Sequence, residues 1–110
     1  MTLPVIVSEP ALIDLLDIND YYLTEVNDRT AAKLIDRLEA AVNSLADFRE
    51  RGNIPKELLG LGLRQYRQIV LKPYRIICEV LSAQVIVHAI LDGRRDMQTL
   101  LMKRLVQYGG

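Results

Sequence analysis

The chain has 110 residues, as many acidic as basic residues, one half apolar residues and a single cysteine. This length suits one domain over residues 1–110, with enough buried apolar surface for a core that needs no disulfide. One cysteine excludes an internal disulfide and favours a reducing compartment. The sequence has neither a signal peptide nor an apolar run of the ~20 residues that span a bilayer. We therefore expect a cytoplasmic protein that makes no contact with a membrane.

The net charge of zero hides a gradient along the chain. Residues 1–28 carry six acids and no Lys or Arg, and residues 29–48 carry three of each sign. Residues 49–110 carry eleven bases and five acids. A neutral protein with this distribution can present one acidic and one basic face.

The first elements are a strand and a helix. The β-branched run PVIV at 4–7 predicts a strand. Ser8 can cap a helix over 9–26, with Pro10 in its first turn, where a missing N–H costs nothing. Helical spacing predicts that this helix buries an apolar stripe made of Leu12, Leu15, Leu16, Tyr22, Leu23 and Val26.

A second helix and a long loop follow. Asn27 and Asp28 offer a new N-cap, and the apolar spacing predicts a helix over 29–47 that forms an antiparallel hairpin with the first. Residues 49–63 contain three glycines and a proline, which predicts a loop. We expect its leucines to pack under the sheet: Leu58, Leu59, Leu61 and Leu63.

The second half changes to a period of two. The runs 66–71, 74–81 and 85–91 predict three strands, and the short gaps between them predict an antiparallel meander. After Gly93 the spacing becomes helical again, which predicts a short C-terminal helix. Helices segregated on one face of an antiparallel sheet define the α+β class.

The residues of metal and nucleophile chemistry are scarce. His88 and Cys78 are the one histidine and the one cysteine, and no ligand cluster surrounds them, so we expect no metal and no cofactor. Both read as strand residues of the core. Neighbouring strands can bring them close, which leaves a Cys–His pair open at this point. GLGL at 60–63 neither follows a strand nor opens a helix, which excludes a dinucleotide site.

The arginines of the second half form the candidate binding site. In a meander, the end of the third strand lies beside the start of the second, so Arg75 is expected near Arg94 and Arg95 at one rim of the sheet. Convergent arginines bind phosphates or the carboxylates of a partner protein. The predicted partner- or anion-binding residues are Arg64, Arg67, Arg75, Arg94 and Arg95.

The runs RQYRQIVLKPYRIICEV and VIVHAILDGRRDMQTLL resemble the RelE/ParE superfamily of type II toxin–antitoxin toxins. The resemblance covers residues 3–105, and its sharpest features are YRIICEV and GRRD. It implies a bacterial toxin that causes growth arrest and is held inactive by a cognate antitoxin. RelE-type members cut mRNA on the ribosome without a metal, whereas ParE-type members inhibit DNA gyrase by binding.

By position, Arg67, Arg75 and Arg95 resemble the basic residues of a RelE-type endoribonuclease. A second expected lysine falls on Ile69, however, and an expected tyrosine falls on Leu101. Arginine stabilises charge but exchanges protons poorly at neutral pH, so this set lacks an acid and a base. The resemblance therefore favours the ParE-like branch, with no catalytic residues.

Three functions remain in competition. The first is a ParE-like toxin whose partners are an antitoxin and gyrase, with no direct sequence-specific binding to nucleic acid. The second is a RelE-like, ribosome-dependent mRNA endonuclease. The third is a degenerate toxin that only binds its antitoxin.

Overall fold

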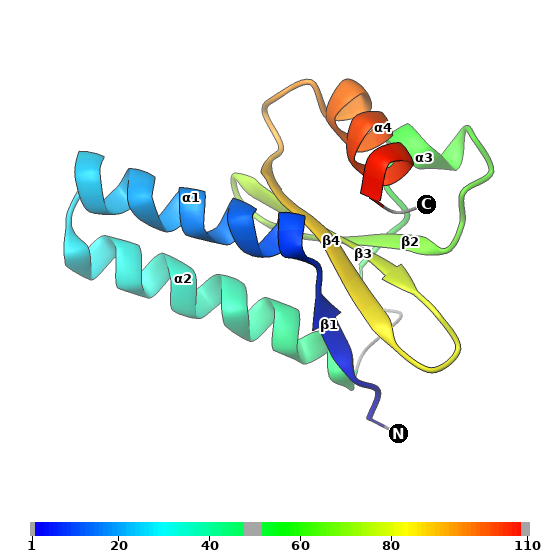
Figure 1. Cartoon of the computed structure of the whole chain (residues 1–110), viewed down its shortest axis with the longest axis horizontal. Coiled ribbons are helices and arrows are strands. Elements are labelled where there is room, and N and C mark those ends of the chain that lie inside the picture. Colours follow the sequence, from blue (N-terminus) through cyan, green and yellow to red (C-terminus); the bar gives the residue numbers. More distant parts are fainter. Residues whose placement is uncertain (1, 48–51, 109–110) are drawn as a thin grey trace.

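The computed structural model describes residues 2–47 and 52–108 (Figure 1). Its elements, in chain order, are β1 (Val5–Val7), α1 (Glu9–Glu25), α2 (Asp28–Asn43), the 3-10 turn η1 (Ser44–Ala46), α3 (Lys56–Leu59), β2 (Tyr66–Leu71), β3 (Tyr74–Val80), β4 (Val85–Asp92) and α4 (Met97–Tyr108). The predicted α+β class and the predicted order of elements are confirmed.

The strands form one sheet in the order β1-β4-β3-β2. β2, β3 and β4 are the expected antiparallel meander. β1 joins the sheet as a parallel neighbour of β4, with Val5 opposite Val85. The α1–α2 hairpin is the connection that carries the chain from β1 to the opposite edge of the sheet.

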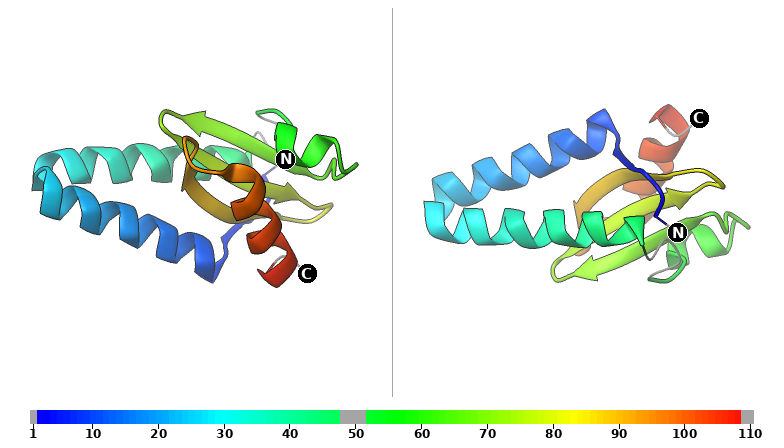
Figure 2. Two further views of the ribbon diagram at one scale, coloured as in Figure 1. Left: turned by 90° about the horizontal axis from the view of Figure 1, so that it is seen from above. Right: turned by 90° about the horizontal axis from the view of Figure 1, so that it is seen from below.

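The hairpin begins at two side-chain caps. Ser8 Oγ accepts a hydrogen bond from Ala11 N at 3.3 Å, and Asn27 Oδ1 accepts one from Thr30 N at 2.8 Å. Each cap satisfies a backbone donor that the first turn of a helix leaves unpaired. The closed end of the hairpin projects beyond the sheet, and α4 lies across the sheet from α2 (Figures 1 and 2).

The predicted apolar stripe of α1 is largely wrong. Only Leu15 and Tyr22 of that set pack against the core, together with Ala11 and Ile18. Leu12, Leu16, Leu23 and Val26 are 47%, 52%, 43% and 49% exposed. α1 has two adjacent apolar faces, and helical spacing alone does not say which one the sheet covers.

A second core fills the other face of the sheet, so the expectation that the helices are segregated on one face is wrong. Leu58, Met97, Leu101 and Leu105 pack there against sheet residues that include Ile77. The expectation of a plain loop over 49–63 is wrong, because Lys56–Leu59 forms the short helix α3. Of the four leucines expected under the sheet, Leu58 is buried and Leu63 is partly buried, whereas Leu59 and Leu61 remain about half exposed.

A β-bulge in β4 sets which residues face each core. Ile77 pairs with Ala89 and Cys78 with Val87, so His88 has no partner in the register. A bulge places two residues opposite one and shifts the alternation of side chains. Val87 therefore faces the helical hairpin, while Ala89 packs in the second core.

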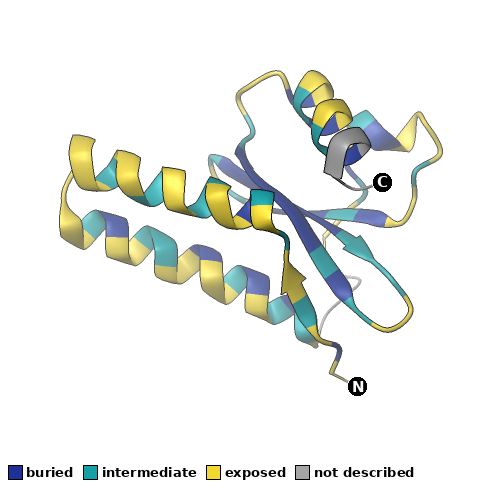
Figure 3. Cartoon of the chain, viewed as in Figure 1, coloured by how far each residue is buried: buried dark blue, intermediate teal, exposed yellow. Residues whose placement is uncertain are grey.

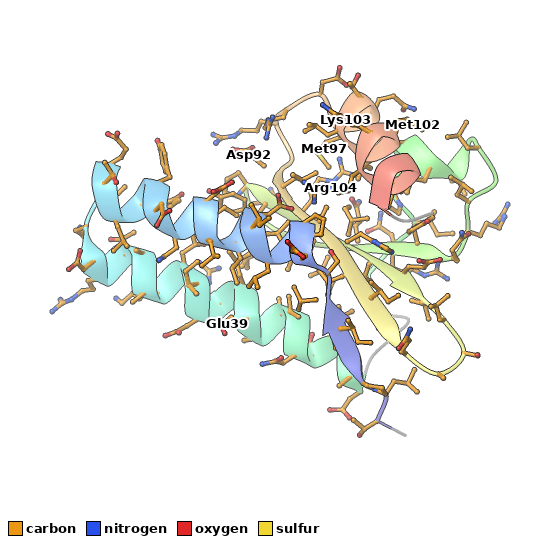
Figure 4. The ribbon with its side chains drawn as sticks, in the orientation of Figure 1. Glu39, Asp92, Met97, Met102, Lys103 and Arg104 are labelled. Atoms are coloured by element: carbon orange, nitrogen blue, oxygen red, sulfur yellow. The ribbon has the colours of Figure 1, made fainter. Side chains whose placement is uncertain are left out.

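An ion pair fastens α4 to α1 and β4. Arg104 donates from Nη1 to Asp14 Oδ2 at 2.8 Å and to the His88 carbonyl at 2.9 Å, and from Nη2 to Asp14 Oδ1 at 3.0 Å. Asp14 Oδ2 also accepts from Ile90 N at 3.0 Å. Arg104 lies between α4 and the sheet, whereas Lys103 beside it lies on the outer side of α4 (Figure 4).

Asp14→Ala should destabilise the fold by about 3 kcal/mol, because it removes the carboxylate that pairs with the largely buried Arg104 and accepts from the Ile90 N–H. Urea unfolding followed by far-UV circular dichroism measures this difference. Asp17→Ala, on the same helix, is the matched control and should change the free energy of unfolding little. Equal effects of the two variants would contradict a fastening role for Asp14.

Candidate functional site

Arg75 is an internal residue of the sheet. It lies in β3, where its Nε donates to Gln68 Oε1 at 2.6 Å. Its Nη1 and Nη2 donate to the two carboxylate oxygens of Glu57 at 3.0 and 2.7 Å. The Arg75 and Glu57 side chains are 11% and 10% exposed. The charge of Arg75 is thus satisfied inside the molecule by a bidentate pair, the strongest geometry for these groups.

The backbone of Gly93 closes over Arg75. A Cβ on Gly93 would lie 2.6 Å from Arg75 Cδ and 3.3 Å from the Pro73 carbonyl oxygen. Arg75 cannot move aside, because Gln68 and Glu57 hold its guanidinium. The topological prediction that Arg75 lies beside the segment after the third strand is therefore correct in position. The guanidinium nevertheless turns inward rather than toward Arg94 and Arg95.

Arg67 and Arg64 lie elsewhere on the molecule. Arg67 is directly opposite Cys78 in the register, and Cys78 belongs to the core under the helical hairpin. Arg67 therefore shares a face with that core, opposite to the face of Arg75. Its Nη1 donates to the carbonyl oxygens of Arg64 and Tyr66 at 2.6 and 3.1 Å. Arg64 itself is exposed.

Arg94 and Arg95 lie in the exposed turn between β4 and α4. Arg94 donates from Nε and Nη2 to the two oxygens of Asp92 at 3.0 and 2.6 Å, with its side chain 76% exposed. This hydrogen bond is the main reason why the pKa of Asp92 falls below its usual value. The Arg95 side chain forms no ion pair within the described residues. Arg95 is therefore the arginine of the pair whose charge remains available.

Two clefts meet at Arg94. One, here called the tyrosine cleft, has a volume of about 470 Å³ and is lined by Asp14, Asp17, Ile18, Tyr21, Tyr22, Tyr74, Ile90, Leu91, Asp92, Arg94 and Arg95. The other, here called the lysine cleft, has a volume of about 530 Å³ and is lined by Asn53, Lys56, Gln68, Val70, Lys72, Pro73, Arg75, Gly93 and Arg94. The turn that carries Arg94 is thus the wall between an aromatic surface and a cationic one.

The tyrosines of the first cleft form a fixed group. The rings of Tyr21 and Tyr22 meet edge to face, with centroids 5.4 Å apart. Burial and a hydrogen bond with Tyr22 raise the pKa of Tyr74, so its phenol stays protonated at neutral pH. Tyr21 is 59% exposed, which leaves an aromatic face open to a partner.

The geometry excludes a pair between Cys78 and His88. Cys78 faces the helical hairpin, and burial raises the pKa of its thiol to about 11. His88 lies on the other face, where its Nε2 is 2.9 Å from Glu79 Oε1 and its ring meets Tyr66 edge to face. No group of His, Cys, Asp and Glu side chains within residues 2–47 and 52–108 could hold a metal ion.

The helical hairpin carries a separate apolar surface. Leu12, Leu16 and Leu23 of α1 and Val26 at its C-terminal end are exposed and recur at helical spacing. Exposed positions recur along the whole length of α1 (Figure 3). Leu12 also lines a cleft of about 160 Å³ between α1, α2 and β1, with Leu38 and Val42 among its other walls. An apolar row beside an apolar cleft is typical of a surface that a partner covers.

Sequence reasoning missed the residues that make these clefts. Glu57 lies in a segment predicted to be a loop. No periodic pattern in the sequence indicates that it pairs with Arg75. Lys56 and Lys72 each stand alone in the sequence, in a loop and in a turn, so no local pattern connects them. Tyrosine is a residue type enriched at protein interfaces, but only the fold places Tyr21 beside Arg94 and Arg95.

Comparison with known proteins places the chain in a family. The model described as "ParE toxin of type II toxin-antitoxin system, parDE" matches residues 5–97. The chain therefore belongs to the ParE toxin family, and it is the toxin of a type II toxin–antitoxin system. The predicted membership of the RelE/ParE superfamily, on its ParE-like branch, is confirmed. Family membership implies an antitoxin as partner.

Solved structures share the fold. A chain of the chromosomal ParDE toxin–antitoxin system from P. aeruginosa matches with a TM-score of 0.68 and 18% identity, over 81% of this chain and 94% of that chain. A double arginine mutant of the E. coli toxin RelE in the free state matches with a TM-score of 0.67 and 12% identity, over 98% and 99%. A search of curated proteins found no significant match. No helix among the described residues is long and apolar enough to cross a bilayer.

Glu57→Gln should lower the free energy of unfolding by roughly 3 kcal/mol at neutral pH, because it leaves Arg75 buried without a countercharge. The hydrogen bond from Arg75 lowers the pKa of Glu57 from its ordinary 4.5. A lowered folded-state pKa gives stability that is full above pH 4.5 and is lost as the pH falls through the folded-state value. The difference in the free energy of unfolding between the wild type and Glu57→Gln should therefore decrease only below pH 4.5.

Urea titrations at several pH values between 3 and 7 measure this gap. Glu25→Gln is the matched control, since Glu25 is an exposed acid at the end of α1. A gap that stays constant down to pH 3, or one that Glu25→Gln reproduces, would show that the ion pair contributes no charge-dependent stability.

Proposed function

We propose that this toxin acts in the cytoplasm by binding DNA gyrase and stalling it, and that a cognate antitoxin neutralises it. The observation that supports the proposal is that the guanidinium of Arg75 is bound within the protein. A catalytic arginine must reach the scissile phosphate, but this guanidinium is already held by Glu57 and Gln68. The residues left on the surface are suited to binding rather than to bond cleavage.

A RelE-like mechanism would need Arg67, Arg75 and Arg95 to act together. Arg67 and Arg75 point to opposite faces of the sheet, so they cannot contact one phosphate. Ile69 is a residue of the hairpin core, and Leu101 is fully buried in the second core. The positions where the resemblance expects a lysine and a tyrosine are therefore packing positions. This argues against the endonuclease alternative.

The tyrosine cleft is the surface that we assign to gyrase. Tyrosine and arginine are the residue types that dominate the binding energy of protein interfaces. The cleft combines an exposed Tyr21, an available Arg95 and an apolar floor that includes Ile18. Asp17 and Arg95 both line it, so the cleft offers both charges. Such a surface fits a protein partner with mixed polarity better than a uniform polyanion.

Arg95→Ala and Tyr21→Ala should each weaken the inhibition of purified gyrase by about tenfold or more, as expected for central interface residues. The measurement is the toxin concentration that halves supercoiling, together with the amount of cleaved DNA. Arg37→Ala, an exposed arginine on α2, is the matched control. Induced expression without antitoxin should arrest growth for the wild type and for the control.

Other outcomes of this experiment would each support a different function or a different gyrase-binding surface. Arrest with gyrase unaffected and mRNA cut at ribosome-bound codons would support the endonuclease. Absence of arrest from a folded protein would support a degenerate toxin that binds only its antitoxin. Inhibition that Arg95→Ala and Tyr21→Ala leave unchanged would move the gyrase surface away from the tyrosine cleft.

We expect the antitoxin to contact the α1–α2 hairpin and the rim of the sheet that carries Arg95. A helical part of its chain would cover the apolar row of α1 with its own apolar face, as helix-in-groove partners do. A following acidic part would reach the segment 64–105, where the uncompensated Arg95 lies. Crosslinks between a co-purified antitoxin and residues 64–105 are expected, and a map that avoids this segment would contradict the second contact.

Leu16→Glu should weaken antitoxin binding by about tenfold or more, since it places a charge where an apolar side chain would be buried. Leu61→Glu is a matched control, because Leu16 and Leu61 are 52% and 50% exposed and lie on different surfaces. In cells that co-express the antitoxin, the Leu16→Glu toxin should still arrest growth, and the Leu61→Glu toxin should not. Full neutralisation of both variants would place the antitoxin elsewhere.

A further inference from the structure

The lysine cleft gathers cations from separate segments of the chain. Lys56 comes from α3, Lys72 from the turn between β2 and β3, and Arg94 from the turn after β4. We propose that this cleft binds the phosphodiester backbone of a nucleic acid and does not cleave it. The inference concerns the toxin alone, and it does not depend on gyrase being the target.

The electrostatic balance of the cleft favours an anion. The charges of Arg75 and Arg94 are offset by Glu57 and Asp92. Lys56 and Lys72 form no ion pair within residues 2–47 and 52–108, and none of the described residues that line the cleft is acidic. Two positive charges therefore remain without a counterion. The tyrosine cleft, in contrast, is lined by three aspartates.

The two lysines are attached to rigid parts of the molecule. Lys56 precedes Glu57, which the bidentate pair fixes to Arg75. Lys72 lies in the two-residue turn that joins paired strands. Fixed attachment points reduce the conformational freedom that a ligand must remove on binding. Gln68, which also lines the cleft, accepts from Arg75 through its amide oxygen, and none of the described residues accepts from its NH₂ group.

The residue types of the cleft are compatible with phosphate. Lysine binds a phosphate group as a point charge, whereas arginine offers its planar bidentate geometry to carboxylate and phosphate alike. Both arginines of the cleft already bind carboxylates of this chain. Phosphate contacts also carry no sequence information, which agrees with the expectation of no sequence-specific binding to nucleic acid.

The cleft is built for binding without chemistry. Its described lining contains no histidine, tyrosine or carboxylate that could take the proton of an attacking hydroxyl or protonate a leaving oxygen. A phosphodiester held there stays intact. This separates the lysine cleft from a nuclease centre, and intact nucleic acid after binding is part of the expected result.

The test uses the four lysines of the sequence as two matched pairs. Lys56→Gln/Lys72→Gln removes the charges of the cleft. Lys33→Gln/Lys103→Gln removes the same net charge from α2 and α4, and all four side chains are exposed, so neither variant should unfold. Fluorescence anisotropy is measured with a labelled 20-base-pair DNA duplex and a labelled single-stranded RNA of equal length, over a series of salt concentrations.

We expect the cleft variant to bind about tenfold or more weakly at low salt and to lose about two units from the slope of log affinity against log salt, one for each phosphate contact. The control pair should behave as the wild type. Tighter binding of the duplex or of the RNA identifies which nucleic acid the cleft takes. Gel analysis should recover both probes intact.

Three results would overturn the proposal. Equal losses in the two variants would show attraction to overall charge rather than to the cleft. Displacement of the oligonucleotides by a glutamate-rich peptide of the same charge at the same concentration would assign the cleft to an acidic protein segment. Wild-type protein that binds neither probe at low salt would exclude nucleic acid. The gyrase assay is separate, so its failure would leave this result unaffected.

Discussion

The bidentate ion pair between Arg75 and Glu57 is the interaction on which the surface of this toxin depends. It holds α3 against the sheet, together with the backbone bridge between Asn53 and Gln68 and the burial of Leu58 in the second core. It also requires a glycine at position 93, because a side chain there would collide with Arg75. The buried pair therefore constrains the turn that separates the two clefts, which the hydrogen bond from Gly93 N to the Pro73 carbonyl also holds.

The sheet is buried on both faces, and this explains why the elements were predictable and some side chains were not. Strands with a period of two and capped amphipathic helices give local signals, so the order of elements followed from the sequence. α1 has two apolar rows, and tertiary packing decides which of them contacts the sheet. The prediction that Leu12 and Leu16 are buried was therefore wrong. The shift of alternation at His88 is likewise invisible, because a bulge has no signal in apolar spacing.

The sequence predicted the position of Arg75 beside the turn after β4, but not the direction of its guanidinium. Topology alone puts Arg75 next to the turn with Arg94 and Arg95, since paired strands fix their neighbours. Whether a guanidinium faces outward depends on a carboxylate that can reach it. Glu57 is 18 positions away in the sequence and lies in a glycine-rich segment, so nothing local connects the two. Pairing across such distances is decided by packing, which composition and periodicity do not describe.

Internal pairing also changes the meaning of the charge gradient along the chain. Three of the arginines of the second half are paired within the chain: Arg75 with Glu57 and Arg104 with Asp14 in its interior, and Arg94 with Asp92 on its surface. Arginine is suited to these roles because its planar guanidinium matches a carboxylate. Among the basic residues without an ion pair in the described part of the chain, Arg95, Lys56 and Lys72 are the three that line the two clefts. Substitutions at Arg75 would consequently report on the stability of the fold, whereas substitutions at these three residues report on binding.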